Sequence, residues 1–229
     1  MRPLFAPILA GANLPDRLFA CLGGVFGIAI TSAISFWALR DAGALPLLVA
    51  PMGAAAVLVF AVPASPLAQP WSVVGGNIVS ALVGVTAARF IPVPHLAAGI
   101  AVGGAILAMS LLRCLHPPGG AAALTAVLGG PAVASAGYGF ALVPVGVNAV
   151  LLMLAGILFH RFSGHSYPHR PVAAVPLPPV PPGAVPHPDD IDRALEDLGE
   201  TFDVTKEDLD LLFRRVEFHA DARRARESA

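Results

Sequence analysis

The feature that most constrains this chain is the near absence of charge over its first 188 residues. That stretch carries nine formal charges, seven arginines and two aspartates, whereas the last 41 residues hold 13 acidic and seven basic residues. A water-soluble domain of that length needs several times as many charges at its surface. With 56% hydrophobic residues overall, the composition excludes a soluble enzyme, a nucleic-acid binder and a disordered chain.

Four apolar runs are long enough to cross a bilayer as helices, which takes about 20 residues. They are Leu18–Leu39, Trp71–Ile91, Leu96–Leu112 and Tyr138–Phe159. Two shorter apolar runs, Leu45–Val62 and Leu115–Leu128, contain or follow prolines and glycines. The sequence therefore predicts an all-α fold, a polytopic transmembrane helix bundle with four long spans and two short helices that are broken or re-entrant.

The six runs form two copies of one pattern. The segment Pro51–Leu58 (PMGAAAVL) aligns with Pro118–Thr125 (PGGAAALT) at a fixed offset of 67 residues. Each segment follows a long span and precedes another. A chance match between alanine- and glycine-rich stretches is the alternative to a true repeat. Interrupted apolar segments at corresponding positions of two halves are a sequence pointer to a transport site.

The charges and prolines outside these runs predict the domain boundaries. We expect an N-terminal segment over residues 1–16, a transmembrane domain over 17–162, a proline-rich linker over 163–188 and a helical cytoplasmic tail over 189–229. No cleavable signal peptide is expected, because the first apolar run exceeds signal length. Four and six crossings both bring the chain back to its starting side. Four arginines near the two ends place that side in the cytoplasm of a bacterial-type inner membrane: Arg2, Arg17, Arg161 and Arg170.

The tail is predicted to form two short helices. The first covers Asp189–Gly199, and the second follows Thr205–Asp208, which has the layout of an N-terminal capping box. Forty-one residues with two small apolar stripes are too few for an independent core. We therefore expect the tail to pack on a second copy of the chain or on another domain, and the protein to be a homo-oligomer in the lipid bilayer.

The most distinctive motif is a double proline followed by two glycines. Pro117 and Pro118 cannot continue a preceding helix, but proline suits the first turn of a new one. A helix that restarts near membrane depth presents free N–H groups and a positive dipole end, which favour an anion. Gly119 and Gly120 allow a ligand or a helix to approach the backbone. We expect the backbone from Pro118 to Ala121 to supply the donors of an anion site.

Two side chains that carry or can carry charge flank this break. Arg113 and His116 are candidates to attract the anion, because a charge near the apolar zone is costly and often functional. Alternatively, Arg113 extends to the lipid headgroups and His116 only caps the broken helix. The break at Pro51 and Gly53 is the corresponding, weaker half of the predicted site, without a charged neighbour.

Two asparagines lie in otherwise apolar spans, and each needs a hydrogen-bond partner there. Asn77 and Asn148 either line the solute pathway or hold helices together. No metal site is predicted, because the histidines near residue 165 have no accompanying carboxylate or cysteine. No nucleotide-binding loop, paired intramembrane carboxylates or activated nucleophile is present, so we expect neither a cofactor nor enzyme activity.

The His116-Pro117-Pro118 tripeptide, within the run Arg113–Thr125, resembles the signature of the HPP family of integral membrane proteins. Further blocks that resemble this family are Pro51–Ala55, Ser65–Pro70, Gly75–Asn77 and Tyr138–Asn148. The resemblance covers about Arg17 to Phe162. It implies a bundle with four transmembrane helices and, for plastid and cyanobacterial relatives, nitrite transport. Many bacterial members continue into a pair of nucleotide-sensing CBS domains, which we expect to be absent from this chain.

Two functional hypotheses from different classes follow. The first is a transporter or channel for a small inorganic anion, with nitrite-like solutes favoured by the resemblance. The second is a membrane-anchored scaffold or sensor that acts through its cytoplasmic tail and its partners. Neither hypothesis involves nucleic acid. Deleting residues 171–229 separates them, because the deletion spares transport and abolishes a scaffold.

Overall fold

The computed structural model describes residues 9–39, 45–170, 188–199 and 201–227. The described residues are helical or irregular and contain no strand. The chain divides into two compact units, one of residues 17–169 and one of residues 1–16 with 170–229. Of the predicted proline-rich linker, residues 171–187 lie outside the described residues.

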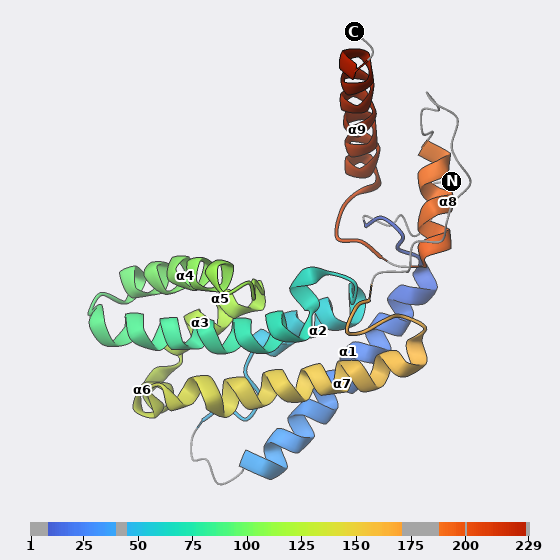
Figure 1. The fold of residues 1–229 in the computed structure, drawn as a ribbon. Helices are drawn as coiled ribbons and strands as arrows, with labels where there is room; N and C mark the ends of the chain where they lie inside the picture. Colours follow the sequence, from blue (N-terminus) through green and yellow to red (C-terminus); the bar gives the residue numbers. More distant parts are fainter. Residues whose placement is uncertain (1–8, 40–44, 171–187, 200, 228–229) are drawn as a thin grey trace, which may run out of the picture. The chain divides into compact units, whose positions relative to one another are not determined.

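The larger unit contains the predicted transmembrane helices. In chain order they are α1 (Leu14–Leu39), α2 (Pro51–Ala61), the 3-10 turn η1 (Pro66–Ala68), α3 (Pro70–Phe90), α4 (Pro94–Leu111), α5 (Pro118–Leu128), α6 (Gly130–Ala136), the π-helical turn η2 (Ala141–Gly146) and α7 (Val147–Ser163) (Figure 1). Four of the helical stretches are long and apolar enough to cross a membrane: Leu14–Ala38, Pro70–Phe90, Pro94–Leu111 and Ala141–Ser163. This confirms the predicted polytopic helical bundle.

The helix starts follow the sequence signals. Asn13 accepts a hydrogen bond from the backbone N–H of Asp16 at 2.9 Å and so caps the start of α1. A proline stands in the first turn of each helix from α2 to α6. The starts of α2 at Pro51 and of α5 at Pro118 are therefore 67 residues apart, as the repeat predicts.

Two details of the second repeat differ from the sequence prediction. The segment after α5 is a separate short helix, α6, bent by 98° from α5 at Gly129. The predicted last span is interrupted at Val143, which has non-helical backbone angles, because Pro144 cannot donate a helical hydrogen bond.

The direction of each pass follows from contacts at its two ends. The beginning of α1 meets the end of α2, where an Arg17 guanidinium N–H donates to the Ala61 carbonyl at 2.9 Å. The end of α1 meets the beginning of α7, where Asn148 Nδ2 donates to Ser35 Oγ at 2.8 Å. Thus α1 is antiparallel to both α2 and α7.

The remaining passes are oriented in the same way. The beginning of α3 contacts the end of α4, where Trp71 Nε1–H donates to the Leu112 carbonyl at 3.0 Å. Where α3 packs on α5, Gly76 is close to His116 and Gly84 is close to Ala123. Residue numbers rise in the same direction along both helices, so the two helices are parallel. The chain therefore alternates in direction through α1, α2, α3, α4, α5 and α7.

This alternation makes the two repeats inverted copies of each other. α1, α2 and α3 of the first repeat run in the opposite directions to α4, α5 and α7 of the second, and the long helices show these directions in Figure 1. The repeats also exchange their last helices. α3 packs against α4 and α5, whereas α7 packs against α2 and also contacts α3, and the side chains of α7 contact α1.

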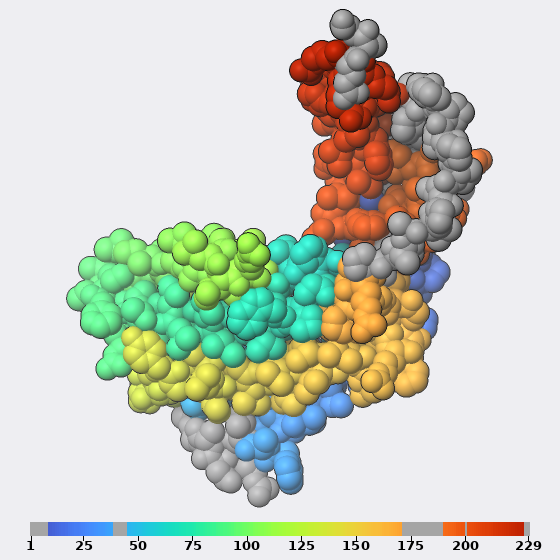
Figure 2. All heavy atoms as spheres, viewed as in Figure 1, coloured from blue at the N-terminus to red at the C-terminus, as the bar shows by residue number. Residues whose placement is uncertain are grey.

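The interior of this unit is largely apolar, and many of its buried side chains are small. Alanines are fully buried on α4 and α5, and in the space-filling view α3 lies between α4 and α5 on one side and α7 on the other (Figure 2). The outer surface also remains apolar, with Val25, Phe90 and Leu111 at least 70% exposed. Such a surface suits a protein whose solvent is lipid.

The smaller unit combines the N-terminal segment with the tail. It contains α8 (Pro188–Leu198) and α9 (Lys206–Glu227). Backbone hydrogen bonds of 2.9 and 3.0 Å join Ala10 to Val204 and Phe202. Half of the predicted capping box is present, since the Asp208 N–H donates to Thr205 Oγ1 at 3.1 Å, while the Asp208 carboxylate accepts from the Thr205 hydroxyl at 2.9 Å.

Candidate functional site

The tight turn between α2 and α3 is fixed by hydrogen bonds within the turn and by one from the chain that follows α7. Gln69 Nε2 donates to the carbonyls of Pro63 and Ser65 at 2.9 and 2.8 Å. Past the end of α7, the Tyr167 hydroxyl donates to the Ala68 carbonyl at 2.8 Å. Burial raises the pKa of the Tyr167 phenol, so the hydroxyl keeps its proton and remains a donor. The chain to His169 thus belongs to the bundle.

This turn positions the Leu67 carbonyl, which is a polar partner of His116. The His116 side chain is fully buried, and its Nδ1 lies 2.8 Å from the Leu67 carbonyl oxygen. A carbonyl only accepts, so Nδ1 donates and carries the ring hydrogen of the neutral imidazole. Nε2, the other ring nitrogen, is buried without a hydrogen-bond partner among the described residues.

The start of α5 packs closely against α3 through small residues. A Cβ on Gly119 would lie 2.5 Å from Ser80 Oγ, and a Cβ on Gly76 would lie 2.6 Å from His116 Cβ. Met109 Sδ of α4 is near both positions, at 2.9 and 3.4 Å. Gly76, Ser80 and Gly84 follow one another at intervals of four, so one face of α3 lets α5 approach.

Three buried polar atoms at this contact have no partner among the described residues. They are Asn77 Oδ1, Ser80 Oγ and His116 Nε2, and all three residues are 0% exposed. The Asn77 Nδ2–H donates to the Val73 carbonyl at 2.8 Å, which leaves Oδ1 as the unpartnered atom of this side chain. Buried polar groups in folded proteins are nearly always paired, so a group of three marks this contact as the candidate functional site.

Two of the backbone donors predicted for an anion, those of Gly119 and Gly120, are already engaged. Pro118 has no N–H, and the N–H groups of Gly119 and Gly120 donate to the carbonyls of His116 and Pro117 at 2.8 and 3.0 Å. Ala121 is exposed on the outer side of α5. The contact between α3 and the start of α5 therefore offers polar side chains more than free backbone donors.

Arg113 lies outside this buried cluster. Its side chain is exposed and its φ of 54° is left-handed. The N–H groups of Arg113 and Cys114 donate to the carbonyls of Ser110 and Met109, which is the Schellman pattern that ends a helix. Arg113 thus terminates α4 at the end of the bundle where α1 begins and α7 ends.

The start of α2 is held by Asn148. The Val49 N–H donates to Asn148 Oδ1 at 2.9 Å, and Asn148 Nδ2 donates to the Leu47 carbonyl at 3.0 Å as well as to α1. Pro51 is buried, whereas Gly53 is exposed and a Cβ there would meet nothing within 4 Å. Of the two roles considered for Asn148, the structure has the one that joins helices.

The two helix starts have different neighbours. α2 and α5 run in opposite directions and contact each other. Asn148 holds the segment before Pro51, whereas His116 precedes Pro118 and packs on Gly76 of α3.

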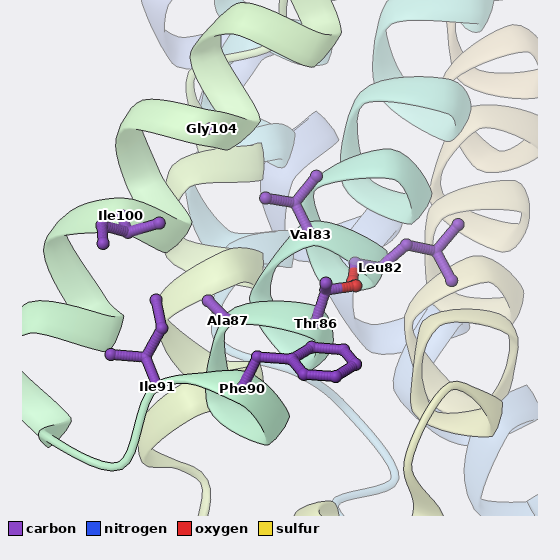
Figure 3. A pocket seen from close by; sticks show the side chains of 8 residues that line it. All are labelled: Leu82, Val83, Thr86, Ala87, Phe90, Ile91, Ile100 and Gly104. Carbon is purple, nitrogen blue, oxygen red and sulfur yellow. The ribbon is translucent and has the colours of Figure 1, made fainter.

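A separate pocket of about 330 Å³ lies between α3 and α4 near the end of α3. Its lining side chains are apolar except for Thr86, as Figure 3 shows. The Thr86 hydroxyl donates to the Leu82 carbonyl at 2.8 Å. This pocket has few groups that could bind a polar solute, and none of the predicted site residues lines it.

Both ring nitrogens of His160, near the end of α7, lie within hydrogen-bond distance of other protein atoms. His160 Nε2 lies 2.9 Å from the Val59 carbonyl, and Nδ1 lies 2.7 Å from Ser163 Oγ. Among the described residues, no group of three or more histidine, cysteine or carboxylate side chains is arranged to hold a metal ion.

Sequence reasoning missed two parts of the site. Ser80 and the Leu67 carbonyl contribute directly to it, and neither was a candidate. Ser80 had a detectable signal, because it lies three residues after Asn77 and shares a helical face with it. The Leu67 carbonyl had none, because the turn that presents it forms through contacts about 100 residues apart.

Residues 10–168 match the family model of the HPP transmembrane region. The chain belongs to the HPP family. It is a multi-pass membrane protein, and the predicted HPP resemblance is confirmed. The His116-Pro117-Pro118 tripeptide of this HPP protein is the segment that joins α4 to α5.

Two curated relatives are transmembrane proteins of Dictyostelium discoideum. One is 34% identical over 165 residues, covering 68% of this chain and 56% of the relative. The other is 31% identical over 156 residues, covering 66% of this chain and 50% of the relative. The chain thus spans about half the length of the curated relatives it matches. No solved structure matches it.

Proposed function

We propose that this HPP protein transports a small inorganic anion, with nitrite as the favoured solute. The observation that carries the proposal is the group of three unpartnered polar atoms at the start of α5. They lie inside an inverted repeat with two short, proline-started helices, an architecture used by many transporters. The resemblance of the HPP motif to nitrite-transporting relatives favours the solute.

The distribution of arginines supports an orientation in the membrane. Arg17, Arg113 and Arg161 lie at the end of the bundle where α1 begins and α7 finishes, and Arg89 lies at the opposite end of α3. Under the positive-inside rule, the first end faces the cytoplasm of a bacterial-type inner membrane. The same arginines would concentrate anions near His116.

Uptake into proteoliposomes tests the proposed transport. We expect liposomes that contain the full chain to accumulate nitrite faster than empty liposomes. His116→Ala should lower the initial rate at least tenfold, and Arg113→Ala should lower it by less, because Arg113 is outside the buried cluster. Uptake equal to that of empty liposomes across nitrite, nitrate, formate and chloride would rule out anion transport.

A scaffold or sensor is the second candidate, and one observation favours it. α9 exposes several large apolar side chains that suit a partner: Leu211, Leu212, Phe213, Val216 and Phe218. Removing residues 171–229 should leave anion uptake unchanged if the bundle is the functional part. Loss of a cellular phenotype with uptake intact would favour the scaffold.

We also propose that the protein works as a homo-oligomer. The most apolar windows of α1 and α4 are only 22% buried, so these helices have large faces free for lipid or another copy. A monomeric mass in mild detergent, measured by light scattering, would contradict this proposal.

A further inference from the structure

The three unpartnered atoms at the start of α5 define what this site can bind. Ser80 Oγ lies at the missing Cβ of Gly119, and His116 Cβ lies at the missing Cβ of Gly76, one helical turn from Ser80. Asn77 lies three residues before Ser80, on the same side of α3, and is equally buried. The unpartnered atoms therefore gather around one contact between α3 and α5.

Hydrogen-bond partners fix the roles of two of these atoms. His116 Nδ1 carries the ring hydrogen because it faces the Leu67 carbonyl, so Nε2 of the neutral ring is an acceptor. Asn77 Nδ2 donates to the Val73 carbonyl, so the free Asn77 Oδ1 is also an acceptor. Only the Ser80 hydroxyl can donate as well as accept.

A site with two acceptors and one hydroxyl does not suit a bare anion. The missing donor is not supplied by α5, because the N–H groups of Gly119 and Gly120 donate within the chain. A proton on His116 Nε2 would turn the acceptor into a charged donor. Protonation thus converts this site into one that matches an anion.

The charges around His116 show what would balance such a proton. From Arg17 to His169, the described residues include no aspartate or glutamate. The titratable groups on the adjoining loop and turn are the buried Cys114 thiol and the Tyr167 hydroxyl, which is bonded at Ala68, while Arg113 is exposed. Among the described residues of the bundle, a buried imidazolium therefore has no carboxylate counterion, and an anion bound beside it would neutralise it.

We propose that the site binds its anion together with one proton, which His116 Nε2 carries, and that the protein moves the two together. This inference rests on the proposed anion transport and specifies its driving force. His116 takes a proton from the aqueous phase when the anion enters, and both leave on the other side. No covalent bond of the anion changes, and the net movement is one anion and one proton.

Proton uptake on binding tests the proposal with the full chain in detergent. Nitrite and nitrate are the probes, and nitrate is included because its strong acid does not leak through lipid. The change in pH of a weakly buffered solution on anion binding should correspond to about one proton per bound anion. His116→Gln should abolish the proton uptake, whereas His95→Gln, an exposed histidine at the start of α4, should leave it unchanged.

Flux measurements then separate this inference from the transport proposal. We expect an inside-alkaline pH gradient to drive accumulation in proteoliposomes, and an inside-positive potential alone to have no effect. Transport driven by the potential, with no proton bound, overturns the coupling and leaves the transport proposal standing. The absence of any anion binding or uptake overturns both. If His116→Gln does not fold, the proton count of the unaltered protein decides.

Discussion

Two adjacent glycines at the start of α5 have different surroundings. Gly119 faces α3, where its missing Cβ leaves room for Ser80 Oγ and the Gly76 carbonyl. Gly120 has only Val102 near the position of a Cβ, at 4.0 Å. A glycine in a helix costs about 0.5–1 kcal/mol relative to alanine. Packing against α3 explains this cost at Gly119, whereas nothing near Gly120 opposes an alanine there.

We therefore predict opposite effects for two neighbouring alanine substitutions. Gly119→Ala should overpack the contact between α3 and α5, lower stability by about 1–3 kcal/mol and reduce anion uptake. Gly120→Ala should unfold at the same temperature as the unaltered protein or slightly higher, and it should transport normally. Thermal unfolding in detergent and proteoliposome uptake measure both. Equal behaviour of the two variants would show that α5 does not approach α3 at Gly119.

Asn148 joins three segments through one side chain, and it is fully buried. Asn148→Leu keeps the branched shape of the side chain but leaves the Val49 N–H and the Ser35 hydroxyl without this partner. We expect a loss of about 1–3 kcal/mol in unfolding free energy, as for other buried groups left unpaired. Ser110→Ala, which removes a hydroxyl bonded within its own helix, is the control and should change stability little. A denaturant titration that ranks the two variants equally would argue against Asn148 as a helix connector.

At the scale of helices, α1 is attached to the bundle by an aromatic ring set against two glycines. The Phe60 ring of α2 lies 2.6 Å from the Cβ position of Gly23 and 2.3 Å from that of Gly27. Phe159 of α7 meets the same ring edge-on, with centroids 5.4 Å apart. The ring is enclosed by three helices and has little room to move.

Gly27→Ala should therefore displace α1 from α2. We expect a loss of about 1–3 kcal/mol, seen as a lower temperature of thermal unfolding. Gly24→Ala is the matched control on the same helix, because a Cβ there would meet nothing within 4 Å. If both variants unfold at the same temperature, the Phe60 contact does not hold α1.

The helices also show which parts of the fold can be predicted from the sequence. The starts of α2 and α5 at Pro51 and Pro118 are predictable, because proline both ends one helix and suits the first turn of the next. The close approach at Gly119 rather than Gly120 is not predictable, because it depends on where α3 lies. The kink at Val143 was missed because an apolar run containing Pro144 still reads as one span.

At the scale of the whole molecule, the alternating directions bear on the number of membrane crossings. α1 and α3 run the same way, so the chain must return between them through α2 and the segments that flank it. By the same reasoning, α5 carries the chain between α4 and α7. The structure therefore favours six crossings, of which the passes at α2 and α5 are made by 11-residue helices and irregular chain.

Four and six crossings place the loop before α4 on different sides of the membrane, so cysteine labelling of this loop distinguishes them. With six crossings, His95 and Phe162 face opposite sides of the membrane, and with four they face the same side. Both side chains are exposed. In a Cys21→Ser background, in which Cys114 is buried, we expect His95→Cys to react with an impermeant maleimide in intact cells. Phe162→Cys should react only after the membrane is opened. Labelling of both positions from one side would mean that α2 and α5 are re-entrant, and it would remove the inverted symmetry on which the transport proposal draws.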